Sequence, residues 1–290
     1  MTNRITKPLE EIAGKTVKLL AKDAGKAVKD LYHDTGKRLK QDADAHLEND
    51  KKIATDLKNI GRRDDPTPVY HIDDDGKITR LHHDPNAENP EDVYRKEDLT
   101  QDDIDRLGLN PDSVGGPKSD ERHPWLKDDE EGKTTPRPKK DSKPVDPGTT
   151  DLSRATQLAR HADRSYGSRK KGVFGSNNYA AARVTNANGK GDFIMVGRSH
   201  RSDRRIPRLQ AHSERMVGTP FLRQGQQHRI QELYTEREPC STSANCSAWM
   251  AERLPGTKVS HSVEYGVTPE SKAAGNAAME HYLDALKASR

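Results

Sequence analysis

Residue 151 marks a change in the pattern of apolar side chains along the chain. Between residues 151 and 290, short segments with helical periodicity alternate with segments of strand-like alternation. Turn and capping residues separate these segments, and the Asn188–Gly189 pair is a strong signal for a β-hairpin. We therefore predict the order helix, two strands, helix, strand, helix, strand, helix.

This order predicts an α/β fold for residues 151–290. A hairpin followed by β-α-β connections gives a mixed sheet with helices packed on it, a three-layer α/β/α arrangement. We expect a helix with Asp151 as its cap, the hairpin over residues 178–199, and a final helix that starts at Thr268. The other expected elements are a short helix within 208–225, a strand over 228–238, a helix over 246–256 and a strand over 257–267.

The residues before position 151 are expected to contribute little to a core. Residues 1–60 have a thin, alanine-rich apolar stripe at helical spacing, which indicates an amphipathic helical segment. Residues 61–150 are rich in Pro, Asp and Lys, which predicts a polar, largely disordered linker. Within it, only residues 69–81 read as strand-like, with a turn at Asp75–Gly76.

Composition supports a globular part that is smaller than the chain. Aromatic residues make up 4% of the 290 residues and charged residues 33%, so one large core cannot span the whole sequence. No run of about 18 apolar residues predicts a transmembrane helix, and the N-terminus lacks the apolar region of a secretory signal. We expect a cytoplasmic protein, or one secreted by a signal-peptide-independent route.

Charge is distributed unevenly along the chain. Residues 61–150 hold 15 Lys and Arg against 23 Asp and Glu, a net charge of −8, whereas residues 151–290 hold 22 against 13, a net charge of +9. A basic C-terminal part indicates an anionic partner such as nucleic acid or nucleotide, although a solvated basic surface is an equal alternative.

Cys240 and Cys246 are the two cysteines of the chain, and both lie in the segment EPCSTSANCSAWM. Three interpretations compete at this point. The pair could form a disulfide in a non-enzymatic interaction protein, one cysteine could be a nucleophile with a histidine base in a hydrolase or deamidase, or both could bind a metal.

An upstream motif favours the metal. His212, Ser213 and Glu214 form an H-x-E motif, and Pro239–Cys240 follows it after a predicted strand. H-x-E followed by P-C-x-x-C is the signature of zinc-dependent base deaminases. His212, Cys240 and Cys246 would supply three Zn²⁺ ligands, and Zn²⁺ bound in this way activates water by lowering its pKa to about 7. Glu214 would then be the general acid and base.

The cysteine spacing departs from this signature, because five residues separate Cys240 from Cys246. On one continuous helix, six steps of about 100° would put the two sulfurs on different faces. A shared metal therefore requires a loop from Cys240 up to about Asn245 and a helix after it.

With these motifs, residues 151–290 resemble the cytidine-deaminase-like superfamily. The strings HSER and ELYTEREPC resemble deaminase domains at the C-termini of bacterial polymorphic toxins, of the Xanthomonas and Streptomyces kinds. The resemblance implies hydrolytic deamination of cytosine or adenine in nucleic acid or nucleotide, a toxin that acts in the target-cell cytoplasm, and a cognate immunity protein. No strand is predicted after the final helix, so that edge of the sheet is expected to differ from fuller members.

Three further residues are weaker candidates for substrate binding. Asn178 resembles the asparagine that contacts substrate in many deaminases, although a polar residue at the entry to a strand is an equal alternative. Arg204 and Arg205 lie in a basic run just before His212 and could bind phosphates, or they could belong to a solvated loop.

Overall fold

The computed structural model describes residues 67–89, 91–110, 139–200, 212–242 and 245–289. The predicted helical segment 1–60 and the candidates Arg204 and Arg205 lie outside these ranges. None of the helices in the described ranges combines the length and the hydrophobicity that a membrane span requires.

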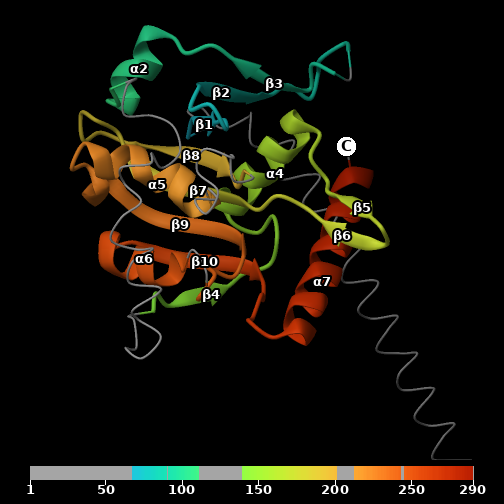
Figure 1. Cartoon of the computed structure of the whole chain (residues 1–290). Helices are drawn as coiled ribbons and strands as arrows, with labels where there is room; N and C mark the ends of the chain where they lie inside the picture. Colours follow the sequence, from blue (N-terminus) through green and yellow to red (C-terminus); the bar gives the residue numbers. More distant parts are fainter. Residues whose placement is uncertain (1–66, 90, 111–138, 201–211, 243–244, 290) are drawn as a thin grey trace, which may run out of the picture. The chain divides into compact units, whose positions relative to one another are not determined.

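A mixed sheet of eight strands organises the described part of the chain, in the order β3-β2-β1-β8-β7-β9-β10-β4 (Figure 1). The pairs β1–β8, β9–β10 and β10–β4 are parallel, and the other neighbouring strands are antiparallel. The strands are β1 (Val69–Ile72), β2 (Ile78–His83), β3 (Tyr94–Glu97), β4 (Ser142–Pro144), β7 (Tyr179–Thr185), β8 (Asp192–Arg198), β9 (Ile230–Arg237) and β10 (Lys258–Val263).

Helices cover both faces of this sheet, as the three-layer prediction requires. The described α-helices are α2 (Gln101–Leu107), α4 (Asp151–Asp163), α5 (Ser213–Arg223), α6 (Cys246–Arg253) and α7 (Pro269–Ala288). α5 and α6 pack on one face with a core that includes Met216, Phe221 and Trp249, and α4 packs on the other with Leu158 and Ala159 (Figure 1). The α/β class and the mixed sheet are confirmed.

Strand β7 shows why the centre of the sheet is apolar on both sides. Successive side chains of a strand point to opposite faces. Ala180 and Ala182 accordingly belong to the core under α5 and α6, whereas Tyr179 and Ala181 belong to the core under α4. All four residues are buried, so β7 is an interior strand.

The contact between α5 and α6 depends on a small residue. A Cβ atom placed on Gly218 of α5 would lie 2.7 Å from a ring atom of Trp249 in α6, which is closer than packed atoms come. Glycine at this position therefore lets the two helices approach, and their N-termini carry His212 and Cys246, two of the three candidate metal ligands.

The prediction of a largely disordered linker is wrong for much of residues 67–110. The strand-like piece at 69–81 forms the hairpin of β1 and β2, and β1 pairs in parallel with β8. Tyr70 and Ile72 are fully buried in the main core. The polar average composition of this stretch gives no indication that β1 joins the core, yet four consecutive buried residues are enough for an interior strand.

The far edge of the sheet is completed from upstream in the sequence. β4, a three-residue strand before α4, pairs in parallel with β10. Its Ser142 hydroxyl lies 2.7 Å from Nδ1 of His261 on β10. β4 therefore lies beside β10 at this edge of the sheet.

Three local details refine the predicted helices. α4 is capped by Thr150, whose hydroxyl accepts from the Ser153 N–H, so Asp151 is the first helical residue instead of the cap. α4 ends at Asp163, because Arg164 adopts a left-handed conformation. Thr268 caps α7 as predicted. The two-stranded sheet of β5 (Ser168–Lys170) and β6 (Val173–Gly175) was not predicted.

Candidate active site

His212 begins the helix that carries the H-x-E motif. It occupies the N-cap of α5 with extended backbone angles, and its carbonyl accepts from the N–H of Met216. Its side chain makes no capping bond, so the imidazole is available for another contact. Nδ1 lies 3.6 Å from Sγ of Cys240. Burial acts to lower the pKa of His212, but Cys240 and Glu214 together outweigh it, and the pKa is raised.

Cys240 and Cys246 meet because the chain turns before α6. Asn245 is the N-cap of α6 in a left-handed conformation, which asparagine tolerates better than most residues, and its side chain accepts from the N–H of Ala248. The backbone N–H of Cys246 then points at Sγ of Cys240, 3.3 Å away. The predicted helix start near Asn245 is confirmed. The wide spacing of Cys240 and Cys246 therefore does not keep their sulfur atoms apart.

His212, Cys240 and Cys246 place their donor atoms within 4.8 Å of one another. Both cysteines are free thiols, and Cys246 is fully buried. In a tetrahedral site with Zn–S bonds of about 2.3 Å, sulfur atoms lie roughly 3.8 Å apart, so only small movements would bring the three atoms to one ion. One imidazole and two thiolates are a donor set that suits Zn²⁺. The residues present therefore fit this metal.

The surroundings of Cys240 disfavour its thiolate form. The contact with Cys246 and then burial raise the pKa of the Cys240 thiol, while His212 acts in the opposite direction. A cation between the sulfurs would favour the thiolate forms, because metal coordination displaces the protons.

Glu214 lies next to this cluster with a buried carboxylate that is 3% exposed. Its Oε2 accepts from the hydroxyl of Ser213 at 3.2 Å, and its Oε1 from the hydroxyl of Thr235 at 3.4 Å. Both contacts are long for O–H···O hydrogen bonds. A carboxylate has about four acceptor positions, so two hydroxyl contacts fix its orientation and leave capacity for a proton or a ligand.

Asn178 connects three parts of the site. Its Nδ2 donates to the hydroxyls of Ser213 and Thr235 at 2.9 and 2.7 Å, and its Oδ1 accepts from the backbone N–H of Arg237 at 3.1 Å. Both amide hydrogens are therefore committed to the protein. The two hydroxyls that receive them are the ones that contact Glu214.

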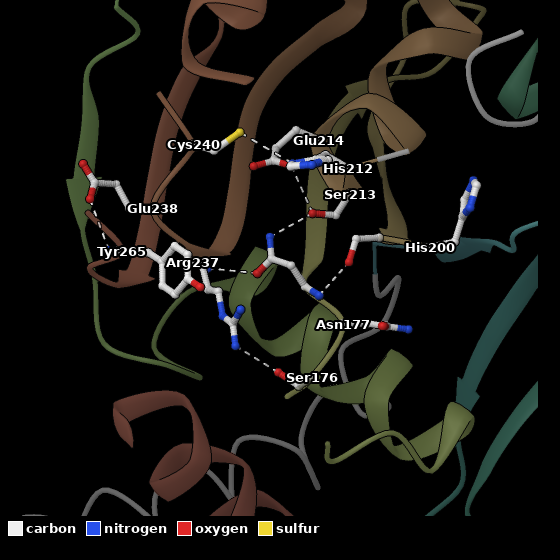
Figure 2. A pocket seen from close by; sticks show the side chains of 12 residues that line it. Ser176, Asn177, His200, His212, Ser213, Glu214, Arg237, Glu238, Cys240 and Tyr265 are labelled. Atoms are coloured by element: carbon white, nitrogen blue, oxygen red, sulfur yellow. Dashed lines mark hydrogen bonds between the residues drawn. The ribbon is translucent and has the colours of Figure 1, made fainter. Parts of the chain in front are cut away.

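A cavity of about 320 Å³ opens beside these residues, within the range of small-molecule sites. Figure 2 shows His212, Glu214 and Cys240 together, with Arg237 and Tyr265 at another part of the wall. The lining residues are Ser176, Asn177, Asn178, Ser199, His200, His212, Ser213, Glu214, Arg237, Glu238, Cys240 and Tyr265.

A family comparison bears directly on this arrangement. Residues 175–282 match the family model of the Xanthomonas-like deaminase. This segment is a deaminase-family domain. It runs from the last residue of β6 into α7, so it contains every residue of the His/Cys/Cys cluster and Glu214. No curated protein and no solved structure matches the chain significantly.

The matched segment is smaller than the fold that it belongs to. Strands β1 to β4 and helix α4 all lie before residue 175, outside the match. They nevertheless complete both edges of the sheet and one of its helical layers. The sheet that contains the matched segment therefore includes strands that the family model does not cover.

The structure brings His212, Glu214, Cys240, Cys246 and Asn178 of the deaminase domain together, as the sequence motifs predict. Sequence reasoning assigned no role in the site to Ser213, Thr235, Arg237 or Tyr265. The alternation in ELYTERE places Thr235 and Arg237 on one face of β9, and this signal could have identified them.

Proposed function

We propose that the deaminase domain is a zinc-dependent hydrolytic deaminase that acts on cytosine or adenine in nucleic acid or nucleotide. The observation that carries the proposal is the cluster of His212, Cys240 and Cys246, with the Glu214 carboxylate beside it at one cavity. This is the donor set and general acid that the base deaminases use. Deaminase-family membership supports an enzyme that acts on C–N bonds.

His212, Cys240 and Cys246 would hold Zn²⁺, which when bound supplies Lewis-acid activation of water. Glu214 would take a proton from the attacking water and deliver it to the ring nitrogen next to the amino-bearing carbon. It would then take the second proton of the added water, from the hydroxyl on that carbon, and deliver it to the departing amine, so that water and the aminated base become the keto base and ammonia. Ser213 and Thr235, held by Asn178, would keep its oxygens directed at the cavity.

The biological setting is part of the same proposal. The net charge of +9 over residues 151–290 favours a polyanionic substrate. The resemblance to polymorphic-toxin domains suggests a toxin that acts in the target-cell cytoplasm and is neutralised in its producer by an immunity protein. Coexpression with the product of an adjacent gene would test this role, because rescue of growth is expected from an immunity protein.

A deamination panel tests the chemistry. The full chain is incubated with single-stranded and duplex DNA, RNA, and free nucleosides and nucleotides, and ammonia and the keto base are measured. We expect about one zinc per chain by elemental analysis and product from at least one substrate. Glu214→Ala should keep the zinc and lose the activity. Activity that survives Glu214→Ala would contradict the assigned mechanism.

A second candidate is a hydrolase or deamidase with Cys240 as its nucleophile and His212 as its base. The 3.6 Å separation of Sγ from Nδ1 favours it. This candidate gives no role to Cys246 and needs no metal. Protein that is free of zinc, and whose activity is lost on alkylation of Cys240, would favour it over the deaminase. The disulfide alternative predicts oxidised, metal-free protein, whereas both cysteines are free thiols here.

A further inference from the structure

Arg237 occupies the cavity wall away from the metal-ligand cluster. It is the last residue of β9, and it shares a strand face with Thr235, which contacts Glu214. Figure 2 shows its guanidinium beside the ring of Tyr265, with Ser176 at its tip. Arg237 therefore belongs to the same cavity as Glu214 without taking part in the cluster.

The hydrogen-bonding capacity of Arg237 is mostly unused. Its Nη2 donates to the hydroxyl of Ser176 at 3.3 Å, and its buried Nε has no hydrogen-bond partner. No carboxylate lies within ion-pair distance of it among the described residues. The neighbouring Glu236 is engaged with Arg160 instead. A guanidinium has five N–H donors in a planar fork, so several remain for a ligand.

Tyr265 holds this guanidinium in place. The Arg237 guanidinium carbon lies 4.9 Å from the centre of the Tyr265 ring, a cation–π arrangement. The backbone N–H of Tyr265 donates to Glu238 at 3.2 Å, which ties the start of the loop after β10 to the end of β9. The arginine is therefore oriented before any ligand binds, and less conformational entropy is lost on binding.

Burial of an unpaired cation is unfavourable, and burial lowers the pKa of Arg237. An anion in the cavity would offset this penalty, and a planar guanidinium with adjacent free donors suits the oxygens of a phosphate. We propose that Arg237, with Ser176 and stacked on Tyr265, forms a subsite for a phosphate group of the substrate. The proposal rests on the proposed function and narrows its substrate to phosphorylated forms, nucleotides or nucleic acid, in preference to free nucleosides.

Substrate preference tests this subsite. The full chain and its Arg237→Gln variant are assayed with deoxycytidine, deoxyadenosine and their 5′-monophosphates. The ratio of kcat/KM for monophosphate to kcat/KM for nucleoside should fall roughly 10- to 100-fold in the variant, the usual range for a charged hydrogen-bonding group. Arg237→Lys should give an intermediate ratio, because it keeps the charge and loses the planar fork.

Arg169→Gln is the matched control, because Arg169 pairs with Glu280 on α7 and does not line the cavity. It should leave the ratio unchanged. Circular dichroism and zinc content should show that each variant is folded. A ratio that Arg237→Gln leaves unchanged overturns the proposal, even if both activities fall, since a role in folding or in base recognition would affect both substrates equally.

A binding experiment separates this proposal from the proposed function. If no substrate is deaminated, the same nucleosides, monophosphates and inorganic phosphate are titrated calorimetrically into the wild-type chain and the Arg237→Gln variant. Tighter binding of monophosphate than of nucleoside, lost in the variant, supports the phosphate subsite although the deaminase proposal fails. Equal binding of the two by the wild-type chain overturns the subsite.

Discussion

Consecutive side chains at the end of β9 point to opposite faces of the sheet and make different contacts there. Glu236 points toward α4, where it is fully buried and bonded to the equally buried Arg160, with Nη2 of Arg160 2.6 Å from Oε2. Thr235 and Arg237 point the other way, toward the cavity. On the α4 face the charges are paired within the protein, whereas on the cavity face Glu214 and Arg237 have no oppositely charged partner within 4 Å among the described residues.

The Arg160–Glu236 pair on the α4 face holds the backbone beside the cavity in place, and we call this pair with its backbone contacts the structural frame. Arg160 also donates to the backbone carbonyl of Asn177, and Glu236 accepts from the N–H of Tyr179. These two contacts flank Asn178, whose amide binds the hydroxyls around Glu214. Fully paired ionic contacts fix the backbone on the α4 face, so the polar groups on the cavity face keep hydrogen-bonding capacity for a ligand.

The same Glu→Gln substitution at Glu214 on the cavity face and at Glu236 on the α4 face should show most clearly that the two faces have different roles. Glu214→Gln removes the proposed proton carrier, and we expect kcat to fall 10²- to 10⁴-fold with little change in stability. Ammonia release and chemical denaturation measure the two quantities. If the variant instead unfolds and retains its specific activity, Glu214 belongs to the structural frame.

Glu236→Gln should have the opposite profile. It leaves the buried Arg160 cation without its counter-charge, and we expect the free energy of unfolding to drop by about 3–5 kcal/mol. Urea denaturation measures the loss. The double variant Arg160→Met with Glu236→Gln should recover part of it, because no unpaired buried charge remains. A loss of less than about 1 kcal/mol would show that the pair does not act as the frame.

Asp163, on the α4 side of the sheet, should make the free energy of unfolding depend on pH. Burial acts to raise its pKa, but contacts with His71, Lys96 and Tyr179 outweigh burial and hold the pKa below its ordinary value of 3.8. The ionised form is therefore favoured by folding, so its stabilisation is present above pH 4 and is lost as pH falls toward the folded pKa. We expect Asp163→Asn to cost about 2–3 kcal/mol at neutral pH.

The control for Asp163 is the pH profile itself. Unfolding free energies of the wild type and of Asp163→Asn, measured between pH 6 and pH 2, should converge as the pH falls. Parallel profiles would mean that Asp163 has the same pKa in the folded and unfolded states.

Asn178→Ala should have the smallest effect, because Asn178 acts on Glu214 only through Ser213 and Thr235. We expect kcat to fall about tenfold with KM nearly unchanged, equivalent to about 1.4 kcal/mol of lost transition-state stabilisation. Asn177→Ala, at the neighbouring cavity position, is the control and should change kcat little. A rise in KM without a fall in kcat would instead support the substrate contact that the family resemblance implies for Asn178.

Much of the site was predictable because its parts are local in sequence. The H-x-E motif places His212 and Glu214 in one turn of helix, and the need for a loop between the cysteines follows from helix geometry alone. The phosphate candidates Arg204 and Arg205, by contrast, came from charge alone, and they lie outside the described residues. Sequence reasoning did not assign Arg237 to the cavity, because its role depends on the adjacent Glu236 being paired with Arg160 instead.

The sequence by itself determined the order of the α-helices and of the main-sheet strands from α4 to α7, because periodicity and capping are properties of neighbouring residues. Tertiary structure alone decided that β1 and β4 join the sheet, since the strands that they pair with lie more than a hundred residues away in the sequence. It also decided that Arg160 reaches Glu236 across 76 positions while Arg237 is left facing the cavity. Which charges are neutralised depends on distances that no local pattern contains, and here those distances distinguish the frame from the site.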